Sequence, residues 1–210
     1  MSFVIRMAGA HDARALYEMA KLAGSGFTNL PPDRPTLAAK IERTLAACAR
    51  DGSVGGDGDV GGVADDQFVL VLENTDTGDV RGTAQLFTCV GQSWPFYSYR
   101  ITTVTQHSRE LGRTVSAELL SLVNDLGGSS EVGGLFLHPG ERAGGLGLLL
   151  ARSRYLFIAM HRARFGERVL AELRGVADEA GGSPFWDAIG GKFFGMSFPE
   201  ADQFNAMHGN

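Results

Sequence analysis

The chain has 210 residues, of which 44% are apolar and 20% are charged, a balance that allows an ordinary hydrophobic core. Its formal net charge is -5, whereas proteins that bind nucleic acids normally carry a surplus of positive charge, so this class is disfavoured. The apolar runs are too short to span a membrane and the first residues do not have the pattern of a signal peptide, so we expect a cytoplasmic protein with neither a nucleic acid nor a membrane as partner.

The N-terminal part of the sequence predicts one strand followed by two helices. Residues 3–7 are compatible with an opening strand, and the first helix should begin near His11 with Asp12 as its N-cap. A helical repeat of apolar residues predicts one buried face on this helix, namely Ala13, Leu16, Met19, Ala20 and Ala23. The second helix should begin at Thr36, directly after Pro35. Its predicted buried stripe consists of Leu37, Ile41, Leu45 and Cys48.

The composition changes sharply between residues 51 and 66, where six glycines and five aspartates fall within sixteen positions. Large apolar residues are almost missing there, so we expect a flexible surface insertion in an otherwise single domain that spans residues 1–210. The segment Asp57-Gly58-Asp59 resembles part of a calcium loop, but the later glutamate ligand is missing. Cys48 and Cys89 have no metal-like spacing, so we predict two buried, reduced thiols and no metal.

The middle of the chain has the composition of antiparallel strands. Three consecutive segments are expected to form a meander: residues 68–73, 80–90 and 96–105. Residues 115–124 are compatible with either a helix or a strand. The turn-forming residues 125–130 favour a strand, because they lead directly into another strand at residues 132–137.

The C-terminal part predicts a helix, a strand and a last helix. The first of these helices follows Arg142, and the strand should span residues 168–176. Residues 184–186 should form the first turn of the last helix, with Ser183 as its cap. This order of elements predicts an α/β fold with a mixed, largely antiparallel sheet flanked by helices.

The segment with the clearest chemical signal runs from Leu135 to Gly147. A strand ends at His138-Pro139, a tight turn follows, and the pattern Arg142-x-x-Gly145-x-Gly147 opens a helix. The unpaired N–H groups and the dipole of a helix N-terminus attract an anion, and glycines let a pyrophosphate approach the backbone. The candidate cofactor-binding residues are Leu135, Phe136, Leu137, Arg142, Ala143, Gly144, Gly145, Leu146 and Gly147.

Two other interpretations of this segment remain. A glycine-rich turn without a ligand is one of them. A dinucleotide-binding site is disfavoured, because it needs parallel βαβ units that the antiparallel run does not provide. The combination of apolar strand, turn and amphipathic helix resembles the acyl-CoA pyrophosphate motif of the GNAT acyltransferase superfamily.

Short motifs distributed along nearly the whole chain add a more specific resemblance. They are residues 26–31, 96–100, 107–111, 124–125, 128–131, 135–137, 153–154, 172–175, 178–179, 183–186 and 193–194. None of these motifs is specific alone. Together and in this order they resemble the motifs of arginine N-succinyltransferases.

This resemblance implies transfer of succinyl from the co-substrate succinyl-CoA to the α-amine of L-arginine, with L-ornithine as a possible second substrate. Leu135 matches the family's succinyl-CoA contact. The family's proton-donor histidine lies in a C-terminal part that extends beyond residue 210. We therefore also consider another acyl donor or amine, a CoA-binding or assembly module without turnover, and association with that C-terminal part or with a second copy.

Five further residues are candidates for catalysis or for substrate binding. His107 and Glu179 are the catalytic candidates. Asp178 is a candidate contact for a guanidinium group, and Arg100 and Arg174 are candidates for the carboxylate of a succinyl group. The alternatives are a histidine bonded to its neighbours, a solvated turn before Ser183, and ordinary structural ion pairs.

Overall fold

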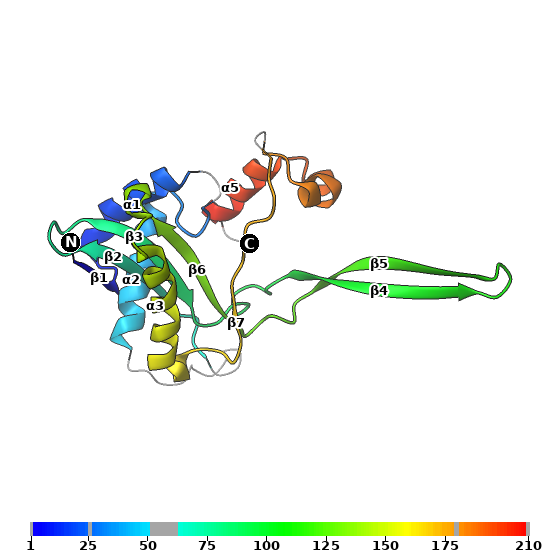
Figure 1. The fold of residues 1–210 in the computed structure, drawn as a ribbon, viewed down its shortest axis with the longest axis horizontal. Coiled ribbons are helices and arrows are strands. Elements are labelled where there is room, and N and C mark those ends of the chain that lie inside the picture. Colours follow the sequence, from blue (N-terminus) through cyan, green and yellow to red (C-terminus); the bar gives the residue numbers. More distant parts are fainter. Residues whose placement is uncertain (1, 25–26, 51–62, 179–180, 209–210) are drawn as a thin grey trace.

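The computed structural model describes residues 2–24, 27–50, 63–178 and 181–208. Its centre is a five-stranded sheet with the strand order β1-β2-β3-β6-β7 (Figure 1). The strands are β1 (Phe3–Met7), β2 (Gln67–Asn74), β3 (Val80–Phe87), β6 (Ser130–Leu137) and β7 (Val169–Leu170). Neighbouring strands are antiparallel except β6 and β7, which are parallel. The predicted mixed, largely antiparallel sheet flanked by helices is therefore confirmed.

Three helices pack on the two faces of this sheet: α1 (Ala13–Ala23), α2 (Arg34–Ala49) and α3 (Leu146–Met160). Val69 and Val71 of β2 belong to one core cluster with residues of α1 and α2. Phe68 and Leu70 belong to a second cluster with residues of α3. Successive side chains of a strand alternate between its faces, so a strand buried on both faces has to be apolar throughout.

The starts of α1 and α2 differ from the prediction. Asp12 is the N-cap residue of α1 as predicted, but it lies in a single 3-10 turn, and its carboxylate accepts hydrogen bonds from the Gly9 N–H at 2.7 Å and from Arg6 instead of from the first turn of α1. The helix α2 begins two residues earlier than expected, because the Asp33 carboxylate accepts a hydrogen bond from the Thr36 N–H at 2.9 Å. An aspartate three residues before a helical N–H satisfies one of the unpaired donors of the first turn.

The buried face of α2 is also rotated from the predicted stripe. Leu37 and Ile41 are buried as expected, but Leu45 is exposed and Thr44 is buried. The Thr44 hydroxyl accepts a hydrogen bond from the Val69 N–H at 3.1 Å, which satisfies its polar atom in the core. Cys48, the last residue of the predicted stripe, is exposed, so the prediction of a buried thiol is wrong there.

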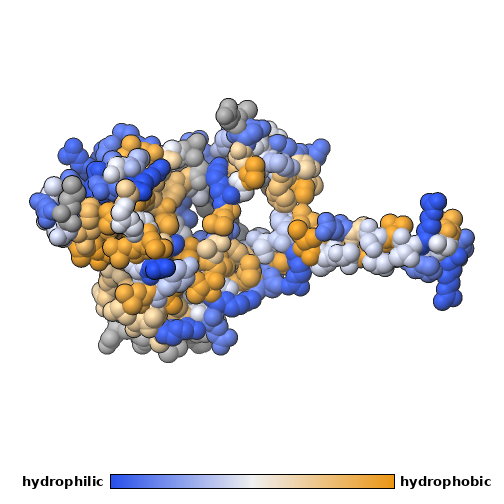
Figure 2. Space-filling model, viewed as in Figure 1, coloured by the Kyte–Doolittle hydropathy of each residue, from blue (hydrophilic) through white to orange (hydrophobic). Residues whose placement is uncertain are grey.

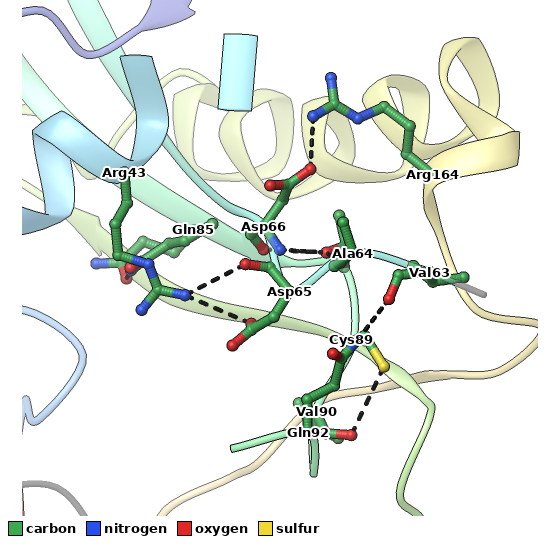
Figure 3. A network of polar contacts seen from close by, with 12 residues as sticks. Arg43, Val63, Ala64, Asp65, Asp66, Gln85, Cys89, Val90, Gln92 and Arg164 are labelled. Carbon is green, nitrogen blue, oxygen red and sulfur yellow. Dashed lines mark hydrogen bonds and ion pairs between the residues drawn. The ribbon is translucent and has the colours of Figure 1, made fainter. Parts of the chain in front are cut away.

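Residues 51–62 of the predicted insertion lie outside the described part of the chain, but its last residues do not. Asp66 is buried and forms ion pairs with Arg50 and, at 2.6 Å, with Arg164. Figure 3 shows the contact of Asp66 with Arg164 and, in the same polar network, Cys89, which is buried as predicted. The predicted flexible insertion therefore has to end before Asp66.

The next two strands do not belong to the central sheet. The strands β4 (Ser98–Ser108) and β5 (Arg113–Val123) pair with each other along their whole length. They form a long hairpin that projects away from the sheet (Figure 1). The strand preferred for residues 115–124 is confirmed, but the expected meander of β2, β3 and β4 is wrong. Period-two patterning predicts a strand and does not identify its partner.

The C-terminal part is less regular than predicted. The strand β7 has two residues instead of nine, and the chain from Ala171 to Asp178 has no regular element. A π-helical turn (Trp186–Gly190) runs into α4 (Gly191–Phe194), and α5 (Phe198–His208) follows. Ser183 was expected to cap this helical segment with its side chain. Instead, its backbone N–H donates a hydrogen bond to the Asp187 carboxylate at 3.1 Å. None of the helices in the described ranges is long and apolar enough to cross a membrane.

Candidate functional site

The strands β6 and β7 separate soon after they meet. They pair only at Ser130 and Glu131 of β6, opposite Val169 and Leu170. Beyond this point the chain after β7 diverges from β6 (Figure 1). One edge of β6 from Val132 onward therefore has no strand partner among the described residues. Backbone N–H and C=O groups on such an edge are available to a ligand.

A bulge in β6 lies beside this open edge. The pairing of β6 with β3 shifts register between Thr83 and Gln85, and Gly134 has a φ of 54°. A Cβ atom on Gly134 would lie 2.7 Å from the Gln85 side chain, so only glycine fits. Because of the extra residue, Gly133 and Phe136 both face the side of the sheet that α1 and α2 cover.

The bulge also fixes which backbone groups of β6 reach the open edge. The His138 N–H donates to the Arg81 carbonyl at 2.8 Å, on the β3 side. Neighbouring residues of a strand point their backbone groups to opposite edges, so those of Leu137, and of Leu135 two residues earlier, face the open edge. The Arg142 Nε–H donates to the Leu137 carbonyl at 3.2 Å, which agrees with this orientation.

A short, well-bonded turn joins β6 to α3. The turn begins with a 3-10 segment (Pro139–Glu141), in which the His138 Nδ1 accepts a hydrogen bond from the Gly140 N–H at 3.1 Å. Arg81 of β3 contacts the same ring nitrogen at 2.9 Å and pairs with Glu141 at 3.0 Å. These contacts hold the turn to the central sheet.

The first turn of α3 has unpaired backbone donors. Gly144 and Gly145 have φ values of 76° and 82°, and a Cβ atom built on either would meet open space. Gly145 is the N-cap and has no side chain to satisfy the helix. Within the described structure, the earliest α3 N–H with a backbone acceptor is that of Leu149, which donates to the Gly145 carbonyl at 3.0 Å. The geometry suits an anion at this end of the helix.

The structure brings the nine predicted cofactor residues together at one place. Leu135, Phe136 and Leu137 form the end of β6, and the segment from Arg142 to Gly147 forms the adjoining turn and helix start. Leu135 is exposed at the open edge, while the Phe136 ring is buried and lies 5.9 Å from the Arg142 guanidinium.

The two candidates on the hairpin lie elsewhere. His107 is exposed near the hairpin tip, and its Nδ1 lies 3.0 Å from the Thr114 hydroxyl of β5. Arg100 lies near the hairpin base and forms an ion pair with Asp125. The hairpin that contains both residues projects away from the central sheet (Figure 1).

Two of the three candidates after β7 can be described, and each contacts its own part of the C-terminal segment. Arg174 pairs with Asp202 of α5 at 2.7 Å. The Asp178 carboxylate accepts a hydrogen bond from the Gly182 N–H at 2.7 Å, within its own turn. Glu179 lies outside the described residues. In the part of the chain that the structure describes, no group of three or more His, Cys, Asp or Glu residues could hold a metal ion.

Sequence reasoning missed a charged cluster at the start of β6. Glu131 is buried, and its burial together with Glu172 raises the pKa of its carboxyl to about 7. Lys40 of α2 interacts with Glu131, and burial lowers the pKa of its ammonium to about 8. The signal available in the sequence was an acidic residue directly before the apolar strand segment 132–137, a position that would otherwise favour another apolar side chain.

Comparisons with known proteins identify relatives along nearly the whole chain. The family model described as the arginine N-succinyltransferase beta subunit matches residues 3–210. Proteins named arginine N-succinyltransferase from Citrobacter koseri and Salmonella paratyphi B are each 42% identical over 95% of this chain. The chain spans 55% of the length of each of these relatives.

A solved structure matches equally far along the chain. Subunit AI of the arginine/ornithine succinyltransferase from Pseudomonas aeruginosa superimposes with a TM-score of 0.87 at 32% identity. The match covers 98% of this chain and 60% of that one. The chain therefore belongs to the arginine N-succinyltransferase beta subunit family.

Proposed function

We propose that this chain contains the acyl-CoA site of an enzyme that transfers a succinyl group from succinyl-CoA to the α-amine of L-arginine, in arginine catabolism. The observation that carries the proposal is the continuity of two sets of unpaired backbone groups. The open edge of β6 runs into the turn that begins α3, so one extended ligand can contact both. Family membership supports the same activity.

Two parts of an acyl-CoA fit this arrangement, the pyrophosphate and the pantetheine arm. The pyrophosphate lies against the first N–H groups of α3, where the glycines at 144, 145 and 147 leave room and Arg142 adds positive charge. The pantetheine arm follows the open edge toward Leu135. Unpaired backbone groups suit its amides, because amides both donate and accept hydrogen bonds.

The reaction needs a polarised carbonyl and a neutral amine. The amine nitrogen attacks the thioester carbon, the C–S bond breaks, and the thiolate of CoA takes up a proton while the nitrogen loses one. The Leu135 N–H on the open edge donates to the carbonyl oxygen, on which negative charge develops. Removal of one such donor typically lowers kcat by roughly 10²- to 10³-fold.

The partners of this site follow from the same proposal. L-Arginine is the amine substrate and L-ornithine a second one, as in the name of the Pseudomonas aeruginosa relative. Because the chain spans 55–60% of the length of these relatives, we propose that full turnover also uses groups from the remaining part of such a protein or from an associated copy. CoA binding relies on local backbone groups and does not depend on that part.

The test is a substitution at Gly147, in the first turn of α3. A Cβ atom there would approach only the Leu137 side chain, at 3.6 Å, so Gly147→Val should fold. Gly145 is less suitable, because its φ of 82° strains any side chain. The valine methyls should block the phosphates and weaken CoA binding, measured by calorimetry, by about tenfold or more.

The matched control is Ala159→Val, which adds the same side chain to an exposed position of the same helix. It should leave the affinity for CoA unchanged. Unaltered CoA binding by a folded Gly147→Val variant would contradict the cofactor site. On the same samples, a thiol-release assay with succinyl-CoA and a panel of amines measures turnover and amine preference.

A further inference from the structure

Three charged side chains converge where β7 leaves β6. Glu131 is paired in register with Leu170 of β7 on one side and with Phe87 of β3 on the other. The Lys40 ammonium lies 6.0 Å from the centre of the Phe87 ring. Glu172 follows Leu170 by two residues and acts electrostatically on Glu131. The cluster therefore combines α2, β6 and the chain after β7, which are far apart in the sequence.

The Glu131 carboxylate is buried without a bonding partner. Its side chain is 7% exposed, and in the described structure it forms neither a hydrogen bond nor a close ion pair. A Cβ atom on Gly133 would lie 3.2 Å from the Glu131 Oε1 and 2.9 Å from the Asn29 amide nitrogen, so both polar groups border the same spot. The Glu131 oxygens are not among the fully buried atoms without a partner in the described residues, so they keep some access to a ligand. A largely desolvated carboxylate without a partner is costly in free energy, and such groups are candidates for binding sites.

The surrounding contacts hold this polar spot in place. The Asn29 carbonyl accepts a hydrogen bond from the Gln85 Nε2 at 2.8 Å, and the Gln85 Oε1 accepts one from the Gln67 Nε2 at 3.0 Å. Gln67 and Gln85 are both buried in the sheet. The spot is therefore built into the fold, four residues before Leu135 on the same strand.

The arrangement of charges selects a class of ligand. A dicarboxylate would meet the like charges of Glu131 and Glu172, and a simple diamine would meet the like charge of Lys40. A molecule with an ammonium and a carboxylate on the same carbon atom complements all three groups, and α-amino acids have this structure.

We propose that Glu131 and Glu172 bind the α-ammonium group of the amino-acid substrate and that Lys40 binds its α-carboxylate. This inference depends on the proposed function, because it places the amine beside the acyl group on β6. The titration behaviour is consistent with it. Burial and the charge of Glu172 raise the pKa of Glu131, and Lys40 lowers it. Burial and the charge of Arg43 lower the pKa of Lys40, and Glu131 raises it. A bound zwitterion would favour the charged forms of both groups.

The experiment compares L-arginine with agmatine, which keeps the amine and the guanidinium but has no α-carboxylate. Both are titrated calorimetrically into the full chain with CoA present. The unsubstituted protein should bind L-arginine about tenfold or more tightly than agmatine, because a buried ion pair is lost with agmatine. Lys40→Met should remove this preference, whereas Lys40→Arg should retain most of it.

A second variant separates the two halves of the site. Glu131→Gln should weaken both ligands by a similar factor of about ten, because both carry the amine, and should leave their affinity ratio unchanged. The control Lys21→Met removes an exposed lysine from the neighbouring helix α1 and should change nothing.

Two results would overturn the inference: no binding of L-arginine by the unsubstituted chain, or an unchanged preference in a folded Lys40→Met variant. The affinity for CoA is measured separately for every variant. An unchanged preference for L-arginine in Lys40→Met together with normal CoA binding therefore rejects only the Lys40–Glu131 site, whereas absence of CoA binding in the unsubstituted chain rejects the proposed function itself.

Discussion

The segment from β6 to α3 and the β4–β5 hairpin are both rich in strand-forming residues, yet they have opposite roles in the structure. β6 is enclosed by β3 and by helices on both faces, and its exposed edge is a small, defined exception. Within the described structure the hairpin strands pair only with each other, and apolar residues such as Ile101 and Leu122 are exposed on them. Figure 2 shows apolar surface along the hairpin. The candidate site therefore lies where the described structure packs around β6 on several sides.

Two contacts of the described structure hold the hairpin at its base. Tyr99 packs edge-on against Phe185, with ring centres 5.1 Å apart, and Arg100 pairs with Asp125. A two-stranded ribbon has little stability of its own in water, because it cannot bury a face. A precise arrangement of reacting groups requires supporting contacts on several sides, which β6 has and the hairpin tip does not.

The largest contrast should appear in stability. Phe136 is 8% exposed within the core cluster of α1 and α2, whereas Ile101 on the hairpin is 66% exposed. Phe136→Ala should lower the free energy of unfolding by about 3–5 kcal/mol, and Ile101→Ala by less than ~0.5 kcal/mol. Urea denaturation of both variants measures the difference. Equal effects would mean that the hairpin is packed as tightly as the sheet.

A second contrast concerns charge. The pKa of Glu131 in the folded protein is about 7, above its ordinary value of 4.5, so the folded state binds this proton more tightly than the unfolded state. The stabilising effect is fully present below about pH 4.5 and is lost as the pH rises to about 7. Glu131→Gln should therefore stabilise the protein by up to ~3 kcal/mol at about pH 8 and have little effect at about pH 4.

Thermal denaturation at the two pH values measures this effect. Glu118→Gln, at an exposed position of β5, is the matched control and should show no comparable gain at the higher pH. A Glu131→Gln variant that is destabilised at both pH values would indicate a structural role for the carboxylate. If Glu131→Gln is more stable but binds the amino acid more weakly, the carboxylate is kept for binding at the expense of stability.

The smallest effect is expected from shortening the hairpin. Thr102 and Leu119 face each other across it, so residues 103–118 can be replaced by Asn-Gly, which favours a two-residue turn. CoA affinity should stay within about twofold and the free energy of unfolding within ~1 kcal/mol. If calorimetry shows a tenfold loss of CoA affinity, the hairpin supports the site after all. Succinyl transfer that survives the deletion would exclude His107 from catalysis.

Local patterns in the sequence predicted much of this structure. The helices α1, α2 and α3 follow from apolar residues at helical spacing, and the strands from apolar runs bounded by turns. The geometry of the candidate cofactor-binding segment was predictable because all of its parts are consecutive: strand end, turn, glycines and helix start lie between Leu135 and Gly147. Short-range errors, such as the start of α2 at Arg34, arose where a side chain three residues away decided the cap.

Only the tertiary structure decided which distant segments meet. The sequence predicted strands for the hairpin but not their partners, because period-two patterning carries no information about which edge is available. The open edge of β6 exists because β7 ends after Leu170, although the sequence favoured a strand up to residue 176. Lys40 and Glu131 are unremarkable separately; they become a candidate site because packing of α2 against the sheet removes water from both charges, and desolvation is a property of the folded chain.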